Sequence, residues 1–128
     1  MAKNWAGERG ELLAARYLRD HGLRIEAANY HSRFGEIDLI ASDSQYIIFI
    51  EVKARGNRML FSPREAVDIR KRERIVKTAM CYLAAAPTSL QPRFDVIEVF
   101  LGAGSDHEKN RINHIENAFD AEGYYAAL

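Results

Sequence analysis

The apolar run Ile47–Ile50 restricts the fold of this chain more than any other feature. An unbroken run of isoleucine and phenylalanine is typical of a strand that is buried on both faces near the centre of a sheet. We therefore predict a central strand over Tyr46–Ala54.

The remaining pattern gives the element order α-β-β-β-α-β-β. Helical spacing of apolar residues with flanking glycine or proline indicates two helices, and alternating or β-branched runs indicate the strands. A helix between two strands implies a right-handed crossover and parallel pairing. We therefore predict an α/β fold with a mixed sheet and flanking helices, as a single domain over residues 1–128. The predicted elements are a helix over Gly10–His21, strands over Leu23–Tyr30, Glu36–Ala41 and Tyr46–Ala54, a helix over Pro63–Ala86, and strands over Phe94–Leu101 and Ile112–Asn117.

The helical spacing also predicts which helix faces are buried. In the first helix the apolar stripe comprises Leu13, Ala14, Tyr17 and Leu18, widened by Leu12 and Ala15. In the second helix the predicted core side carries Ile69, Val76, Ala79, Met80 and Leu83, and a basic row near the other side carries Lys71, Arg74 and Lys77.

Two pairs of charged residues lie on neighbouring predicted strands. Glu36 and Asp38 are two residues apart, and so are Glu51 and Lys53. Because side chains alternate across a strand, each pair projects from one face. The segment 42–45 is typical of a turn, so the two strands are expected to form a hairpin. In the matching register, three carboxylates and one ammonium meet on one surface.

Such a cluster favours a bound divalent cation, because adjacent carboxylates repel one another. The chemistry that it indicates is metal-assisted cleavage of a phosphodiester. Each motif alone is weak evidence: Glu-x-Lys is usually a surface pair on a strand, and Gly-Glu-Ile-Asp also fits a turn followed by a strand with one polar face. The two motifs together, at the end of an apolar strand, are stronger evidence for a metal site.

The predicted sheet places this cluster along one edge, next to the first helix. Glu11 on that helix is a candidate to point toward the cluster. The alternative is that Glu11 is an ordinary acid near a helix N-terminus, where it stabilises the helix dipole.

The charge is unevenly distributed, although the chain is neutral overall. The segment 51–77 has nine Lys or Arg against four acids, and the segment 95–128 has two against seven. One basic surface on a neutral protein is enough to attract a polyanion, although a solvated helix face explains the same pattern. The single cysteine and the lack of an apolar leader or spanning segment fit the cytoplasm and argue against a membrane protein.

The chain resembles the YraN-type family of small bacterial proteins, within the PD-(D/E)XK nuclease superfamily. The resemblance covers nearly the whole chain, and one departure from the superfamily signature is Ile37 in place of proline before Asp38. The matching segments are Gly10-Glu11, Ala14-Ala15, Tyr17-Leu18, Asn29-Tyr30, Gly35 to Ile40, Phe49 to Lys53, Lys71 with Ala79, Tyr82-Leu83, Arg93 to Val96, and Asn117 to Phe119.

The resemblance implies a restriction-endonuclease-like fold and a Mg²⁺ or Mn²⁺ site. Its ligands would be Asp38, Glu51 and the main-chain carbonyl of Val52, with Glu11 completing the site directly or through water. Lys53 would orient the attacking water and stabilise the charge that grows on the phosphate.

Further roles follow from the same resemblance. Glu36 would hold a water or a second metal beside the first, unless it is only a solvent-exposed strand acid. Arg55 and Lys71 would contact phosphates, unless they are solvated surface residues. The charge pattern adds Arg74 and Lys77 as phosphate contacts, because they recur with Lys71 every three residues in the basic segment. Tyr82, Arg93 and Asp95 are interpreted as packing and polar support.

The resemblance leaves three functions open. The first is a metal-dependent endonuclease that hydrolyses phosphodiester bonds in DNA, with branched or damaged DNA in repair or recombination as the expected substrate. The second is a nucleic-acid-binding protein on the same fold that cuts slowly or not at all. The third is a protein-interaction module or a different hydrolase. A homodimer is expected only by analogy with junction resolvases.

Overall fold

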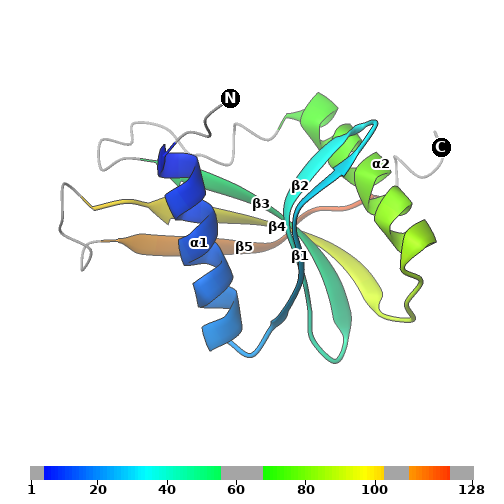
Figure 1. Cartoon of the computed structure of the whole chain (residues 1–128), viewed down its shortest axis with the longest axis horizontal. Coiled ribbons are helices and arrows are strands. Elements are labelled where there is room, and N and C mark those ends of the chain that lie inside the picture. Colours follow the sequence, from blue (N-terminus) through cyan, green and yellow to red (C-terminus); the bar gives the residue numbers. More distant parts are fainter. Residues whose placement is uncertain (1–4, 56–67, 103–109, 122–128) are drawn as a thin grey trace.

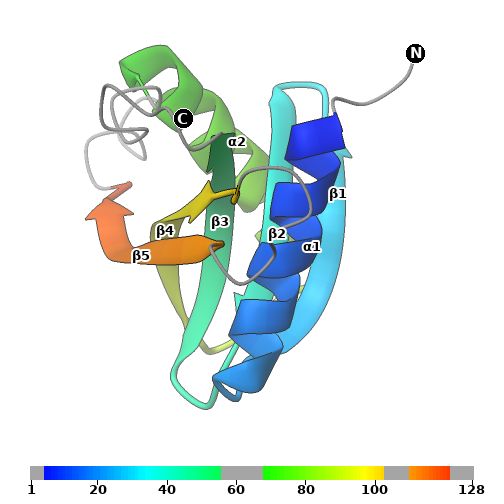
Figure 2. The ribbon, with the colours of Figure 1, turned by 90° about the vertical axis from the view of Figure 1, so that its left-hand side faces the viewer.

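The protein is a five-stranded twisted sheet with one helix against each face. The computed structural model describes residues 5–55, 68–102 and 110–121. The strands follow one another across the sheet in the order β1-β2-β3-β4-β5 (Figure 1). In Figure 2, α1 lies in front of the sheet and α2 lies behind it. The elements are α1 (Trp5–Asp20), β1 (Arg24–Ser32), β2 (Gly35–Ser42), β3 (Tyr46–Arg55), α2 (Ile69–Ala85), β4 (Gln91–Phe100) and β5 (Arg111–Phe119).

The predicted element order and the mixed sheet are confirmed. β1 with β2 and β2 with β3 pair antiparallel, β3 and β4 pair parallel, and β4 and β5 pair antiparallel. The parallel pair is the one that the intervening helix predicts. The start of the second helix, predicted at Pro63, lies outside the described residues. Its described part begins at Ile69, where the N-cap Asp68 accepts a hydrogen bond from the backbone N–H of Lys71.

β3 is buried on both faces, as predicted. Ile48 and Ile50 belong to the core beneath α1, and Ile47 and Phe49 belong to the core beneath α2. All four side chains are at most 3% exposed, so each stabilises the fold by roughly 1.5–3 kcal/mol through burial. This alternation decides which residues of β3 face which helix.

The first helix differs from its prediction in two respects. It begins at Trp5, so Gly10 lies inside it. A Cβ on Gly10 would lie 2.5 Å from the Cβ of Ala54, so the absence of a side chain lets α1 approach β3 closely. Leu12 is 71% exposed and does not extend the buried stripe, because it projects to the side of the helix away from Ala14 and Leu18.

The buried face of α2 also differs from the prediction. Ile69 and Met80 are 68% and 39% exposed. Val76 and Ala79 are buried as predicted, and the helix also buries Ile75 and Thr78. Thr78 belongs to this set because its hydroxyl lies 2.7 Å from the hydroxyl of Ser32 at the end of β1, which satisfies the buried oxygen. This contact fixes α2 against the β1–β2 turn.

A buried carboxylate, that of Asp95, connects β4 and β5. Asp95 is fully buried and accepts two bonds of 2.9 Å from the guanidinium of Arg93. His114 Nε2 lies 2.7 Å away, and the N–H of Asn117 donates to it at 2.9 Å. Burial alone would raise the pKa of Asp95, but these bonds outweigh it and leave the pKa below its usual range. Asp95 therefore joins β4 to β5.

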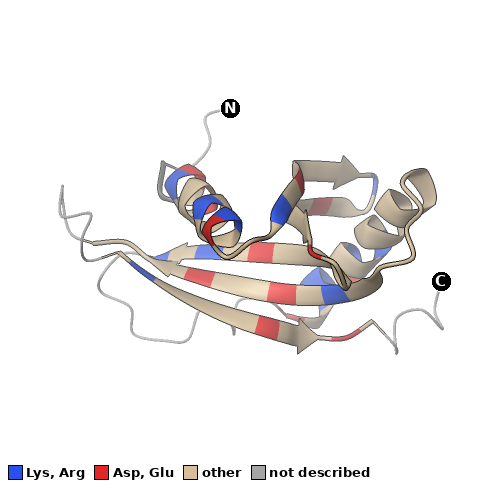
Figure 3. Ribbon diagram, turned by 90° about the horizontal axis from the view of Figure 1, so that it is seen from below, with Lys and Arg blue, Asp and Glu red and all other residues tan. Residues whose placement is uncertain are grey.

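Among the described residues, no helix has both the length and the apolar character to cross a membrane. Figure 3 shows Lys and Arg on both helices and acidic residues along the strands.

Candidate active site

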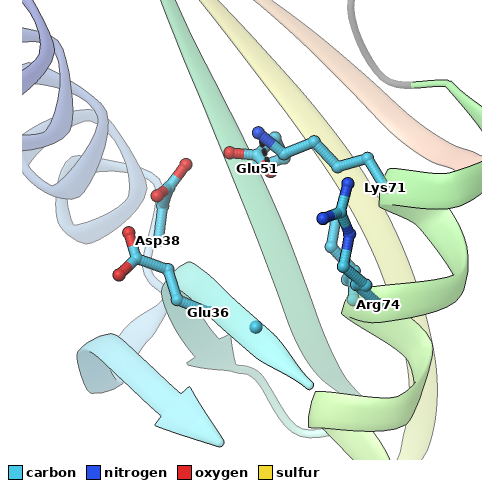
Figure 4. Close-up of a pocket in the computed structure, with 7 residues that line it drawn as sticks. Glu36, Asp38, Glu51, Lys71 and Arg74 are labelled. Carbon is cyan, nitrogen blue, oxygen red and sulfur yellow. Dashed lines mark ion pairs between the residues drawn. The ribbon is translucent and has the colours of Figure 1, made fainter. Parts of the chain in front are cut away.

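A pocket of about 250 Å³ lies between β2, β3 and α2. We call it the Asp38–Glu51 pocket. Figure 4 shows the two carboxylates on neighbouring strands and the basic side chains of α2 reaching toward them. Its lining residues are Gly35, Glu36, Asp38, Glu51, Lys71, Arg74 and Ile75.

The pocket forms where the hydrogen bonding between β2 and β3 ends. The two strands pair only from Leu39–Ile50 to Ser42–Ile47, although β2 begins at Gly35 and β3 continues to Arg55. Immediately beyond the last pair, Oδ2 of Asp38 accepts a hydrogen bond of 2.8 Å from the N–H of Val52. A carboxylate thus bridges the two strands where the ladder between them stops.

The position of the pocket corrects one prediction. The cluster was expected along a sheet edge next to the first helix, but β2 and β3 are interior strands and the pocket lies beside α2. The reason is strand alternation: Glu51 is two residues from Phe49, whose ring belongs to the core beneath α2. Glu51 therefore faces α2 as well.

The two carboxylates are almost completely buried and interact strongly. Asp38 is 8% exposed and Glu51 is 6% exposed. Burial, a hydrogen bond with Glu51 and the charge of Glu51 raise the pKa of Asp38 to about 8, against the opposing effects of the Val52 N–H and Lys71. The ionised form of Asp38 is therefore disfavoured in the metal-free pocket.

Two lysines compensate part of this negative charge. The Nζ of Lys71 lies 3.2 Å from Oε2 of Glu51. Burial lowers the pKa of the Lys53 ammonium; the charge of Glu51 opposes this shift and Lys71 adds to it. Lys53 is therefore the easier of the two ammonium groups to deprotonate, because the pKa of Lys71 is raised, chiefly by Glu51 against the effect of burial.

The basic row of α2 was predicted near the side of the helix away from the core, and none of its three members is buried in the core. Lys71 and Arg74 line the pocket. Lys77 pairs instead with Glu73, at 3.2 Å, one helical turn away.

The other predicted site residues differ in whether they line the Asp38–Glu51 pocket. Glu36 lines the pocket and lies 3.2 Å from Nδ1 of His31. Arg55 is half-buried at the end of β3. Glu11 lines a separate pocket between α1 and β1, together with Glu8 and Leu12. The structure therefore does not bring Glu11 to the wall of the Asp38–Glu51 pocket, and its part in metal binding stays a prediction.

Two residues that line the pocket, Gly35 and Ile75, were not predicted as site residues from the sequence. Gly35 has a φ of +155°, and a Cβ there would lie 3.4 Å from the Cβ of Arg74. Glycine next to Glu36 was a signal for this close approach. Ile75 gave no comparable signal, because one isoleucine among basic residues does not reveal which way the helix faces.

The donor set suits a hard divalent cation, which prefers oxygen ligands. Asp38 and Glu51 supply two carboxylates on a rigid part of the sheet. Within the described ranges, no third His, Cys, Asp or Glu joins them in a group that could hold a metal ion.

Comparison with known proteins places the chain in a family. A family model described as "Uncharacterised protein family UPF0102" matches residues 10–99. A UPF0102 protein of Caldanaerobacter subterraneus subsp. tengcongensis is 44% identical over 121 residues, which cover 91% of this chain and 96% of the relative. A UPF0102 protein of Lachnoclostridium phytofermentans is 42% identical over 125 residues, covering 96% of this chain and 99% of the relative. The chain therefore belongs to the uncharacterised protein family UPF0102.

Proposed function

We propose that this protein is a metal-dependent nuclease of the PD-(D/E)XK superfamily that hydrolyses phosphodiester bonds in DNA. The single observation that carries the proposal is the pair of buried carboxylates, Asp38 and Glu51, at the point where β2 and β3 stop pairing. Burial and the neighbouring Glu51 make ionisation of Asp38 unfavourable in the metal-free site, as the raised pKa of Asp38 indicates. A bound divalent cation would remove that cost.

The polar residues in and beside the pocket have distinct roles in the proposed reaction. Asp38, Glu51 and the carbonyl of Val52 would hold Mg²⁺ or Mn²⁺, which polarises a phosphoryl oxygen and lowers the pKa of a bound water. Lys53 would orient the attacking water and stabilise the negative charge that grows on the phosphate. Glu36 would hold a neighbouring water, and Lys71 and Arg74 would bind the substrate phosphates.

Branched or damaged DNA, in repair or recombination, is the substrate class that we propose. The test incubates purified protein with supercoiled plasmid, linear duplex and four-way-junction DNA in Mn²⁺, with Asp38→Ala protein prepared in parallel. Cleavage by the wild type alone supports the proposal. Binding of DNA without cleavage in Mg²⁺ or Mn²⁺ would instead identify a catalytically inactive nucleic-acid-binding protein on this fold.

DNA affinity is expected to fall steeply as the salt concentration rises, because the cations of α2 contact phosphates. Each phosphate contact contributes about 0.9 to the slope of log affinity against log salt. The Lys71→Ala/Arg74→Ala variant is expected to lower this slope by about two units. The measurement is fluorescence anisotropy with a labelled duplex across a salt series.

Lys77→Ala is the matched control for this experiment. It removes one positive charge from the same helix, but Lys77 does not line the Asp38–Glu51 pocket. Its effect on the slope is therefore expected to be smaller than that of either pocket residue. An unchanged affinity and slope in the double variant would exclude this face of α2 from nucleic-acid binding.

A further inference from the structure

The ammonium of Lys71 pairs with Glu51, a carboxylate that the proposed function assigns to the metal. Its Nζ lies 3.2 Å from Oε2 of Glu51, and Figure 4 shows its side chain extending from α2 to that carboxylate. The side chain of Glu51 is only 6% exposed, whereas that of Lys71 is 36% exposed. The ion pair therefore joins a fixed, buried acid to a base that has access to solvent.

An ammonium and a divalent cation compete for such a carboxylate. Both bind the same oxygen atoms, and a cation at Glu51 would lie within a few ångströms of the Lys71 charge. Charges this close, and partly shielded from water, repel by several times the thermal energy. One of them has to leave when the other binds.

The ammonium of Lys71 can move away from Glu51 while its backbone stays in place. Lys71 lies in the first turn of α2, and its backbone N–H donates to the N-cap Asp68 at 2.9 Å. The backbone thus stays fixed, while the flexible four-carbon stem can swing the ammonium toward solvent. Arg74 lies one turn further along the same wall, so a displaced ammonium stays beside a second cation at the mouth of the pocket.

We propose that Lys71 is a resident counter-ion of the metal site, which a divalent cation displaces and which then binds a nucleic-acid phosphate. The inference rests on the proposed function, since it takes Glu51 as a metal ligand. Metal and nucleic acid then bind cooperatively through one side chain: metal binding releases the ammonium, and a phosphate that holds the ammonium leaves Glu51 available to metal.

The first test measures Mn²⁺ affinity by isothermal titration calorimetry in the absence of nucleic acid. Lys71→Met keeps an unbranched side chain and the N-cap bond but removes the charge, and it is expected to bind Mn²⁺ at least about tenfold more tightly than the wild type. Lys71→Arg is expected to resemble the wild type. Arg74→Met is the matched control, because it removes one positive charge from the same pocket wall, and it is expected to change the affinity less than Lys71→Met does.

The second test measures the coupling. Duplex DNA affinity is determined by fluorescence anisotropy with and without Ca²⁺, a weaker Lewis acid chosen to limit cleavage. Ca²⁺ is expected to raise the affinity of the wild type at least about fivefold more than that of Lys71→Met, because the variant has no ammonium to release.

The outcomes separate the inference from the proposed function. Equal Mn²⁺ affinity in the wild type, Lys71→Met and Arg74→Met, abolished by Asp38→Asn, would overturn the inference and leave the metal site standing. Tighter Mn²⁺ binding by Lys71→Met without any DNA cleavage by the wild type would support the inference and overturn the nuclease. Absence of Mn²⁺ binding in every variant would overturn both.

Discussion

The Asp38→Ala protein is expected to cleave DNA at least about a thousandfold more slowly than the wild type, because loss of a metal ligand removes roughly 4 kcal/mol of transition-state stabilisation. Glu51→Ala is expected to lose a similar factor. Lys53→Ala is expected to lose about 10²–10³, the usual cost of removing one group that stabilises a developing charge. The measurement is the initial rate at saturating DNA and Mn²⁺.

Asp20→Ala is the matched control for this series. It removes an exposed carboxylate at the end of α1, outside the residues that line the Asp38–Glu51 pocket, and it is expected to retain the wild-type rate. Circular dichroism of each variant checks that it is folded. A wild-type rate in Asp38→Ala would show that the cleavage belongs to another site or to a contaminant.

The metal-free protein is expected to lose stability as the pH rises from about 4 to about 8. The pKa of Asp38 is about 8 in the folded protein, against an ordinary value of 3.8. Between these values the folded state binds more protons than the unfolded state, so the free energy of unfolding falls as the pH rises. The stabilisation is complete below pH 4 and is lost as the pH passes 8.

Urea unfolding of the wild type and Asp38→Asn, in a metal chelator at several pH values between 5 and 8, measures this effect. The amide side chain of the variant does not ionise, so the variant is expected to show a much flatter pH dependence and to be the more stable protein at pH 8. Mn²⁺ at millimolar concentration is expected to restore stability to the wild type at pH 8, because it binds only the folded state. Parallel pH profiles for the two proteins, with no response to metal, would indicate that Asp38 is an ordinary structural acid.

The part of the site that lies on strands could be predicted from the sequence. Strand periodicity assigned Asp38 and Glu51 to neighbouring strands, and the turn at 42–45 fixed the pairing closely enough to bring them together. These signals are local: an apolar run, a period of two and a short turn. Site residues that depend only on these signals can be predicted from the sequence.

The part of the site that lies on helices could not be predicted. Lys71 faces Glu51 because α2 is rotated by its contacts with the β1–β2 turn, namely the Thr78–Ser32 hydroxyl pair and the close approach of Gly35 to Arg74. Helical periodicity does not encode contacts between segments far apart in the chain. For the same reason Met80 was predicted to be buried, whereas in the structure Met80 is exposed and Ile75 is buried.

The position of Glu11 could not be predicted from the sequence either. A helix acid near a predicted sheet can point to several places, and the structure places Glu11 in the pocket between α1 and β1. Gly10 shows why: its close contact with Ala54 sets the rotation of α1, and no periodicity reports that contact.

Anomalous diffraction from crystals grown with saturating Mn²⁺ tests the metal site most directly. We predict one strong peak between the carboxylates of Asp38 and Glu51, with the ammonium of Lys71 moved away from Glu51. An empty Asp38–Glu51 pocket at saturating Mn²⁺, or a peak only beside Glu8 and Glu11, would contradict the proposal that these two carboxylates form the metal centre.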